Sequence, residues 1–145
     1  MRCVYCEAPE IKERKIVQTK YSFAFPTNIP IVPGHVLVCP IRCVKDLYDL
    51  TNEEKLDLIN LVFTIQQALK KTFNAEGFNI AYNQGEVAGQ NIPHLHVHVL
   101  PRKNGDAGIT EYEPRKFLYR PGSRETIPEN ELKEIAELIK NNILI

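Results

Sequence analysis

The stretch HLHVHVL, residues 94–100, holds three of the four histidines in the chain. Histidines and aliphatic residues alternate along it. Because successive side chains of a strand point to opposite faces, His94, His96 and His98 would share one face and the aliphatic side chains the other. A helix would instead spread the three histidines around its axis. The pattern therefore predicts a strand that packs its aliphatic face on a core and can present its histidines to solvent.

The bulk composition is that of a single globular domain. The chain has 145 residues, of which 43% are hydrophobic and 25% charged, and its formal net charge is zero. Without a net charge or a long apolar segment, we expect neither nucleic acid nor a membrane as a partner. The opening residues MRCVYCEAPE lack the apolar region of a secretory signal. We therefore expect a cytoplasmic protein with reduced thiols.

The segments around the histidines predict an α+β domain with an antiparallel sheet of about five strands. Stretches rich in β-branched and aromatic residues, bounded by Pro or Gly, are typical of strands. We expect Pro101 to end the histidine strand. The expected strands cover residues 15–26, 35–41, 78–83 and 94–101.

Two helices are predicted by their start signals and by apolar residues at helical spacing. Thr51 and Glu54 fit a capping box, followed by a long central helix that ends near residues 74–77. Thr126 and Glu129 fit a second box at the start of a C-terminal helix. The opening of the chain is expected to be polar and turn-rich.

Three histidines on one face favour a functional site over a structural role. A single histidine in a strand is usually a surface residue or a core residue with satisfied hydrogen bonds. If three faced the core without partners, each unsatisfied group would cost about 1–3 kcal/mol. Histidine is also a common metal ligand and acid–base group near neutral pH. From spacing alone, a catalytic triad and a three-histidine zinc site both stay open.

The sequence resembles the histidine triad (HIT) family of nucleotide hydrolases and transferases. HLHVHVL fits the alternating His-x-His-x-His pattern of that family. Four further segments resemble its fragile histidine triad branch, the diadenosine polyphosphate hydrolases: PIVPGHVLVCPIR (30–42), DLYDLT (46–51), NQGEVAGQ (83–90) and LPRK (100–103). The resemblance implies one HIT-like α+β domain over residues 1–145, and a homodimer in which two sheets join.

The resemblance also implies an enzyme that cleaves dinucleoside polyphosphates at the α-phosphate through a covalent nucleotidyl-histidine. His96 would be the nucleophile, because a neutral imidazole carries a lone pair at neutral pH. His98 would bond to phosphate oxygens or the leaving group, with His35 and Gln90 in the same site. A nucleoside phosphoramidase and an adenylyl-sulfate hydrolase are alternatives within the family. Outside the enzyme class, the alternative is a slow-turnover nucleotide-binding signalling module.

The Gly-rich loop before the histidines would bind phosphate, because glycines let main-chain N–H groups approach anionic oxygens. On composition alone, the loop is more simply an ordinary turn. At the position eight residues before His35, where the family usually has a ribose-binding Asn or Asp, this chain has Thr27, followed by Asn28. No organic cofactor is implied, and a divalent metal is not strictly needed for the chemistry. The implied nucleotide-binding residues are Thr27, Asn28, Asn83, Gly89, Gln90, Asn91 and His98.

The region after the histidines resembles the family less. A loop rich in Gly and Pro and the C-terminal helix would form a branch-specific segment over residues 103–145. The basic residues of the loop could hold the far half of a dinucleotide or could form a solvated surface. They are Arg115, Lys116, Arg120 and Arg124.

Cys3 and Cys6 form a Cys-x-x-Cys pair that is by itself a weak signal, because a redox pair or chance spacing looks the same. Prokaryotic members of the family often carry such a pair as half of a structural zinc site. The resemblance implies that Cys43 and His94 complete it here, with residues 1–10 as the zinc-binding segment. Cys39, within an apolar strand, is expected in the core. The competing interpretation is unrelated reduced cysteines.

Overall fold

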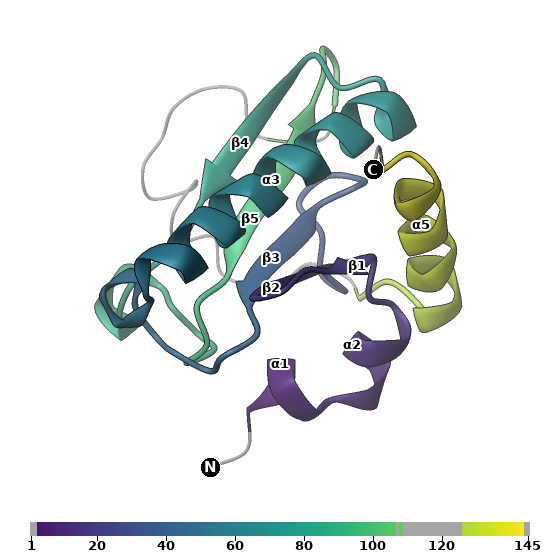
Figure 1. Cartoon of the computed structure of the whole chain (residues 1–145). Coiled ribbons are helices and arrows are strands. Elements are labelled where there is room, and N and C mark those ends of the chain that lie inside the picture. The colour runs from purple at the N-terminus through teal and green to yellow at the C-terminus, as the bar shows by residue number, and fades with distance from the viewer. Residues whose placement is uncertain (1–2, 107, 109–125, 144–145) are drawn as a thin grey trace.

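The computed structural model describes residues 3–106, 108 and 126–143. No helix in these ranges is both long enough and apolar enough to cross a membrane. Figure 1 shows the arrangement, with the long helix α3 crossing the strands. In chain order the elements are α1 (Val4–Glu7), α2 (Pro9–Glu13), β1 (Val17–Gln18), β2 (Ser22–Pro26), β3 (Val36–Pro40), η1 (Leu47–Asp49), α3 (Asn52–Phe73), β4 (Gly77–Ala81), η2 (Glu86–Ala88), β5 (Val97–Arg102) and α5 (Glu129–Asn141).

Five strands form one antiparallel sheet in the order β1-β2-β3-β5-β4. The histidine strand β5 therefore lies inside the sheet, and β4 lies at one edge. His98 is paired with Leu37 of β3 on one side and with Ala81 of β4 on the other. This sheet, with its long central helix and C-terminal helix, confirms the predicted α+β class.

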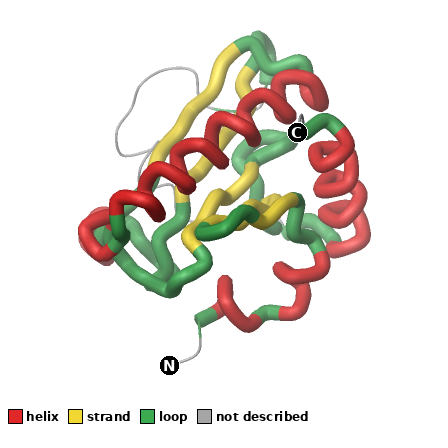
Figure 2. Tube along the Cα trace, in the orientation of Figure 1, coloured by secondary structure: helices red, strands yellow, loops and turns green. Residues whose placement is uncertain are grey.

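Helix α3 begins with the predicted capping box. The Thr51 side chain accepts a hydrogen bond from the Glu54 main-chain N–H at 3.1 Å, and the Glu54 carboxylate accepts one from the Thr51 N–H at 2.9 Å. The helix ends at Phe73, and its C-cap residue Asn74 has a left-handed φ of 53°. Figure 2 shows α3 in red across the yellow strands, with α5 packed near its C-terminal end.

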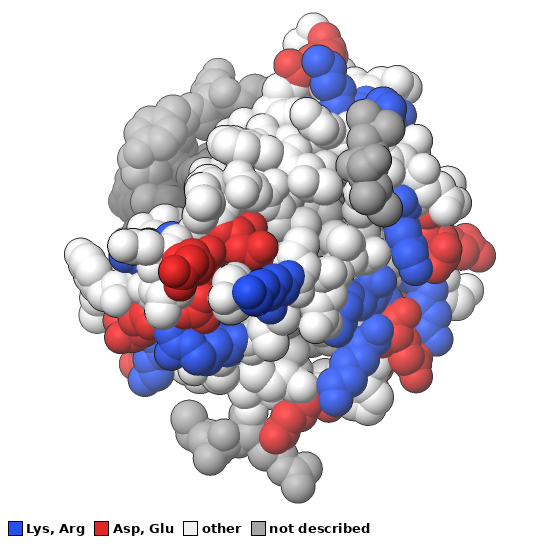
Figure 3. All heavy atoms as spheres, viewed as in Figure 1, with Lys and Arg blue, Asp and Glu red and all other residues white. Residues whose placement is uncertain are grey.

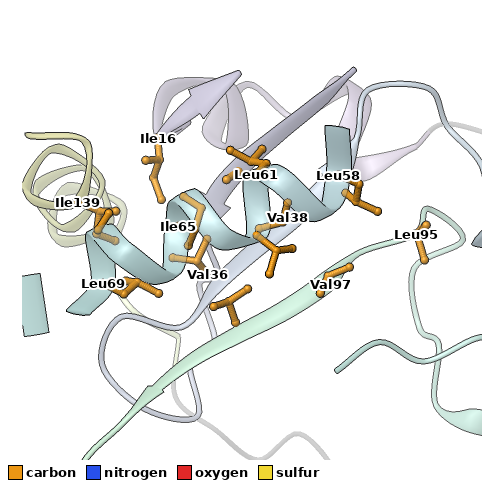
Figure 4. Packing of buried hydrophobic residues seen from close by; sticks show 14 of the residues in the cluster. Ile16, Val36, Val38, Leu58, Leu61, Ile65, Leu69, Leu95, Val97 and Ile139 are labelled. Carbon is orange, nitrogen blue, oxygen red and sulfur yellow. The ribbon is translucent and has the colours of Figure 1, made fainter. Parts of the chain in front are cut away.

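The two faces of the sheet carry separate hydrophobic clusters, because neighbouring side chains in a strand alternate between faces. The smaller cluster contains Cys39, as expected, together with Ile11 of α2 and strand residues Phe23, Phe25 and Leu37. The larger cluster joins the opposite face to α3 and α5 (Figure 4). Its members include Ile16, Val36, Val38, Leu58, Leu61, Ile65, Leu69, Leu95, Val97 and Ile139. Helices α1 and α2 thus lie on the face opposite α3.

The N-terminal third of the chain differs from the prediction in two places. The expected single strand over residues 15–26 is a hairpin, in which β1 pairs with β2. The turn at Thr19 to Tyr21 is held by α3, because the Asp57 carboxylate accepts from the Thr19 hydroxyl at 2.5 Å and from the Tyr21 N–H at 3.2 Å. The opening segment forms the short helices α1 and α2 rather than turns.

Two expected element ends are also wrong. Pro101 does not end the histidine strand, because it pairs with Phe78 and β5 continues to Arg102. Helix α5 has Pro128 at its N-cap and no side-chain capping bond, so Thr126 and Glu129 form no capping box. Glu129 bonds instead to Arg14.

Charged side chains of both signs are mixed on the face of the molecule that carries α3 (Figure 3). On the α3 face, acidic and basic residues lie next to one another (Figure 3). This agrees with the zero formal net charge of the sequence.

Candidate active site and metal centre

The three histidines share one side of the chain, as the alternation predicts, but they are not presented openly to solvent. β5 begins at Val97, so His94 and His96 lie just before the strand. Leu95 belongs to the larger core cluster. His94 is 0% exposed and His96 is 8% exposed, while His98 is half-buried. The solvent-facing triad that the alternation permits is therefore not what forms, because the N-terminal segment covers His94 and His96.

The ring of His96 is fixed by its neighbour's main chain. His96 Nδ1 donates a hydrogen bond to the carbonyl oxygen of His94 at 2.9 Å. That bond requires the proton on Nδ1, so Nε2 of the neutral ring carries the lone pair. Burial lowers the pKa of His96 below its usual value, although the bond to His94 acts in the other direction. A neutral, nucleophilic Nε2 is the result.

His35 and His98 are joined by a hydrogen bond between their rings. The main-chain N–H of Ile31 donates to His35 Nδ1 at 3.1 Å, and His35 Nε2 lies 2.9 Å from His98 Nδ1. Because Nδ1 of His35 is an acceptor, its neutral ring has the proton on Nε2 and donates it to His98. The proton of neutral His98 is then on Nε2. Main-chain contacts therefore give His96 a lone pair and His98 a donor proton on their Nε2 atoms.

The rings of His96 and His98 lie near each other, with centroids 5.1 Å apart. His35 and His98 have the same centroid separation. The structure thus brings together three of the four residues that the sequence assigned to catalysis.

The predicted phosphate loop includes the short 3₁₀ turn η2. Gly85 and Gly89 have φ angles of 91° and 94°, in a region that favours glycine. Gln90 is buried, and its side chain braces the loop: its Oε1 accepts from the Gly85 N–H at 2.8 Å, and its Nε2 donates to the Lys45 carbonyl at 3.2 Å. Asn83 is half-buried and Asn91 is exposed. The nucleotide contacts assigned to this loop stay predictions.

Thr27 lies beside His35 in the fold. The Thr27 N–H donates to the His35 carbonyl at 3.2 Å, and its hydroxyl accepts from the Ile29 N–H at 3.3 Å. Asn28 is half-buried, and its carbonyl accepts from the Ile127 N–H at 2.8 Å. Arg115, Lys116, Arg120 and Arg124 lie outside the described residues.

Cys3, Cys6, Cys43 and His94 come together as predicted, in what we call the Cys/His cluster. One ligand atom from each of the four residues lies within 4.8 Å of the others. Nδ1 of His94 is 3.2 Å from the Cys3 sulfur and 3.5 Å from the Cys6 sulfur. Its Nε2 donates to the Pro40 carbonyl at 2.7 Å, which leaves the lone pair on Nδ1 facing the thiols. A histidine that donates its other N–H to a carbonyl is the usual form of a metal ligand.

The chemistry of this donor set fits zinc. Three sulfurs and one imidazole nitrogen match a closed tetrahedral structural site, in which Zn–S bonds of about 2.3 Å separate the sulfurs by about 3.8 Å. Burial and the neighbouring Cys3 raise the pKa of Cys6 to about 12, and burial raises the pKa of the Cys43 thiol. Without a cation, the Cys6 and Cys43 thiols therefore hold their protons; a bound cation would stabilise the thiolates.

Tyr5, which the sequence analysis did not single out, contacts two of the site histidines. Its ring centroid lies 5.2 Å from that of His96 and 5.7 Å from that of His94, in edge-to-face arrangements. The sequence feature that could have indicated a role for Tyr5 is its position between Cys3 and Cys6. Nothing in the linear pattern connects it to His96, 91 positions away.

The sequence model of the HIT domain matches residues 8–105. This chain belongs to the HIT domain family. The match includes all four histidines and the loop at residues 83–91, and it ends before the part of the chain that least resembles the family.

Relatives of this HIT domain carry names that refer to dinucleotide hydrolysis. A bis(5'-nucleosyl)-tetraphosphatase (asymmetrical) of Schizosaccharomyces pombe is 49% identical over 89 residues, which cover 61% of this chain and 49% of that protein. A bis(5'-adenosyl)-triphosphatase of Dictyostelium discoideum is 38% identical over 130 residues, or 86% of this chain and 84% of that protein. This HIT domain thus spans about half of the first relative and most of the second.

Solved structures share the fold. The zinc-bound histidine triad family protein of Mycobacterium smegmatis superposes with a TM-score of 0.74 at 28% identity, over 98% of this chain and 93% of that one. The similarity therefore extends beyond the segment that the family model matches.

Proposed function

We propose that this HIT domain hydrolyses dinucleoside polyphosphates, such as diadenosine tri- or tetraphosphate, at the α-phosphorus through a covalent nucleotidyl-His96. The observation that carries the proposal is the pair of opposite Nε2 states, a lone pair on His96 and a donor proton on His98. The two relatives named as dinucleoside polyphosphatases support this substrate class.

The reaction follows from these two rings. Nε2 of His96 attacks the α-phosphorus, and the bond between phosphorus and the bridging oxygen breaks with its electron pair on that oxygen. The Nε2–H of His98 donates to the departing oxygen. The carbonyl of His94 stabilises the positive charge that develops on the His96 ring, through the Nδ1–H bond of 2.9 Å. Water then attacks phosphorus and releases a proton to solvent, the P–N bond breaks, and its electron pair returns to Nε2 of His96.

A substrate panel tests the proposal. Diadenosine tri- and tetraphosphate, adenylyl sulfate and an adenosine phosphoramidate are compared as substrates, with the nucleotide products quantified. We expect the dinucleotides to give the highest kcat/KM. His96→Ala should reduce turnover by at least about 10⁴-fold, because it removes the nucleophile. His96→Gly with added imidazole should recover part of the rate. Wild-type turnover in His96→Ala would contradict the covalent step.

The same panel separates the alternatives. A preference for the phosphoramidate or for adenylyl sulfate would favour the alternative enzymes of the family. They use the same nucleophile, His96, but a different leaving group. Tight nucleotide binding with negligible turnover of every compound would favour a signalling module. Turnover should persist without free magnesium, because the histidines and loop amides carry the charge stabilisation.

We also propose that the Cys/His cluster binds one structural zinc ion. The support is the donor set, the lone pair of His94 Nδ1 facing the thiols, and the similarity to a zinc-bound family member. Because the three thiols must stay reduced to act as ligands, the proposal includes a cytoplasmic location.

Metal analysis of the purified protein tests the zinc proposal. We expect about one zinc per chain in the wild type. Cys3→Ala and Cys43→Ala should lose most of it. Cys39→Ala is the matched control, since this thiol is fully buried in the smaller core cluster rather than in the Cys/His cluster. Equal zinc content in Cys43→Ala and wild type would rule out this ligand set.

We further propose a homodimer through the β4 edge. Among the residues that the structure describes, β4 pairs with β5 alone, so we expect its other side to accept a strand from a second copy. Ile80 is paired with Val99, which places its side chain on the α3 face, and it is exposed together with Ile59 and Phe63 of α3. Light scattering should give a dimer mass for the wild type and for Leu138→Lys on α5, and a monomer mass for Ile80→Lys. A wild-type monomer at every concentration would contradict this assembly.

A further inference from the structure

The Tyr5 ring lies against the proposed nucleophile from the N-terminal side. Its centroid is 5.2 Å from that of His96, and the two ring planes make an angle of 84°. The same ring makes edge contacts with His94 at 5.7 Å and with Phe25 at 5.3 Å. Tyr5 therefore packs between the smaller core cluster and the histidine side of the site.

The position of the His96 ring matters because only one of its orientations makes the bond to His94. Rotation of the imidazole about its Cβ–Cγ bond would take Nδ1 away from the His94 carbonyl, now 2.9 Å away, and would lose the fixed tautomer. A perpendicular ring packed against the imidazole restricts that rotation sterically. Tyr5 supplies such a ring.

No residue of the short helix that carries Tyr5 is fully buried, and its apolar packing comes from the Tyr5 ring. α1 comprises only Val4–Glu7, and none of its residues is buried. The Cys3 and Cys6 residues on either side of Tyr5 direct their sulfurs to His94 Nδ1, at 3.2 Å and 3.5 Å. The side chains of the Cys/His cluster thus fasten α1 to the histidine segment together with the Tyr5 ring, and they act on both sides of it.

We propose that Tyr5 is a positioning residue for His96, held against it by the Cys/His cluster. The proposal rests on the assignment of His96 as the nucleophile. Tyr5 acts through the orientation of the His96 ring rather than through substrate, and a thiophilic divalent cation such as zinc strengthens the arrangement by joining Cys3 and Cys6 to His94. The cluster thereby influences the active site as well as the stability of the N-terminal segment.

The test combines ring spectroscopy with kinetics on the full-length, zinc-loaded protein. Histidine rings labelled with ¹⁵N report which ring nitrogen carries the proton, and the His96 signals are identified by their loss in His96→Gln. In the wild type, we expect the proton of His96 on Nδ1. In Tyr5→Leu, we expect signals averaged between tautomers and a kcat about tenfold lower, because small misplacements of a reacting group slow the chemistry. KM should change less than about threefold.

Two further variants complete the comparison. Tyr5→Phe keeps the ring and should restore both the His96 signals and most of kcat relative to Tyr5→Leu. Val4→Ala, an exposed neighbour on the same turn, is the matched control and should change neither. If Tyr5→Leu does not fold, Tyr5→Met replaces it, because an unbranched side chain fills space without a flat ring. Unchanged His96 signals and unchanged kcat in the folded variant would overturn the proposal.

The metal arm needs no substrate. Removing zinc with a chelator should shift the His96 ring signals as Tyr5→Leu does, and adding zinc back should reverse the change. Identical spectra with and without zinc would overturn the role of the cluster.

A raised KM with normal kcat and normal ring signals in Tyr5→Leu would instead assign Tyr5 to substrate binding. If the wild type cleaves no compound, the proposed function fails, and the ring spectra still test whether Tyr5 positions His96.

Discussion

His94 looks equivalent to His96 and His98 in the sequence but differs from both in its partners. Its ring faces two thiols on one side and the Pro40 carbonyl on the other, while its own carbonyl orients His96. Alternation along a strand determines which side chains share a face. It does not determine what covers that face, and here the N-terminal helices do. The burial of His94 and His96 therefore could not be predicted locally.

Gly34, the residue before His35, is required to be glycine for two reasons, its backbone conformation and its close neighbours. Gly34 has a φ of 88°, and a Cβ placed there would lie 2.8 Å from two ring carbons of Phe73 and 3.0 Å from Pro101. Gly34→Ala should therefore lower the free energy of unfolding by about 2 kcal/mol or more, from backbone strain and overpacking together. Urea denaturation measures the change.

Gly77 provides the control for this substitution. A Cβ at Gly77 meets nothing within 4 Å. Gly77→Ala should change the free energy of unfolding by less than about 1 kcal/mol. Equal effects of the two substitutions would show that Gly34 has no special role.

At the scale of an element, the capping box of α3 depends on an ionised carboxylate. Hydrogen bonds, first from Arg42 and then from the Thr51 N–H, lower the pKa of Glu54 from 4.5 to about 2. Because the folded-state pKa is the lower one, the stabilisation is fully present above pH 4.5 and is lost as the pH falls toward 2. Arg42 is half exposed, so solvent screens the pair and its contribution to the free energy of unfolding is small.

Chemical denaturation of Glu54→Gln at several pH values checks this prediction. The difference from the wild type should be largest near pH 7 and should shrink below pH 4.5. Glu53→Gln, which removes an exposed charge in the same turn, serves as the control and should show a smaller difference. A difference between wild type and Glu54→Gln that does not vary with pH would contradict the prediction.

Elements with a long local signal were predicted well, and those without one were missed. The 22 residues of α3 carry a capping box and several turns of helical spacing, and the structure confirms both. The hairpin of β1 and β2 was missed because its turn, Thr19 to Tyr21, has no Gly, Pro or Asn. Its hydrogen-bond partner, Asp57, comes from α3. Helices α1 and α2 are too short for a periodic pattern.

In the candidate site too, some features could be predicted from the sequence and others could not. The alternating histidines and the family motif indicated which residues would gather, including the four members of the Cys/His cluster. The contact of Tyr5 with His96 and the bond from Ile31 to His35 depend on how loops and the N-terminus pack on the sheet. Sequence alone gives no signal for such contacts. The assignment of residues 1–10 as a zinc-binding segment and of residues 103–145 as a branch-specific segment stays a prediction.

At the scale of the whole molecule, a buried arginine ties the C-terminal helix to the N-terminal half. Arg14 is 4% exposed, donates to the Pro26 carbonyl at 2.9 Å, and bonds to both carboxylate oxygens of Glu129 on α5 at 2.9 and 2.8 Å. Glu129→Gln leaves the buried guanidinium without its counter-charge. We expect it to lower the free energy of unfolding by about 1–2 kcal/mol, since Glu129 itself is partly exposed.

One helical turn further along α5, Lys133 supplies a matched comparison. It pairs with Glu13 of α2 at 2.9 Å, but both side chains are largely exposed. Lys133→Gln should change the free energy of unfolding much less than Glu129→Gln does, because an exposed ion pair contributes little. Thermal unfolding of both variants tests the contrast, and an equal loss in both would refute the special role of Arg14.

The Cys/His cluster has a consequence for the order of events during synthesis. Cys3 and His94 are 91 positions apart in the chain. At a translation rate of about 5–20 residues per second, the two N-terminal thiols are made roughly 5–20 seconds before the imidazole that faces them. A nascent chain can therefore complete this set of four ligands only after β1, β2, β3, α3 and β4 have been made. Closure of the N-terminal segment over the histidines therefore cannot come before the synthesis of His94.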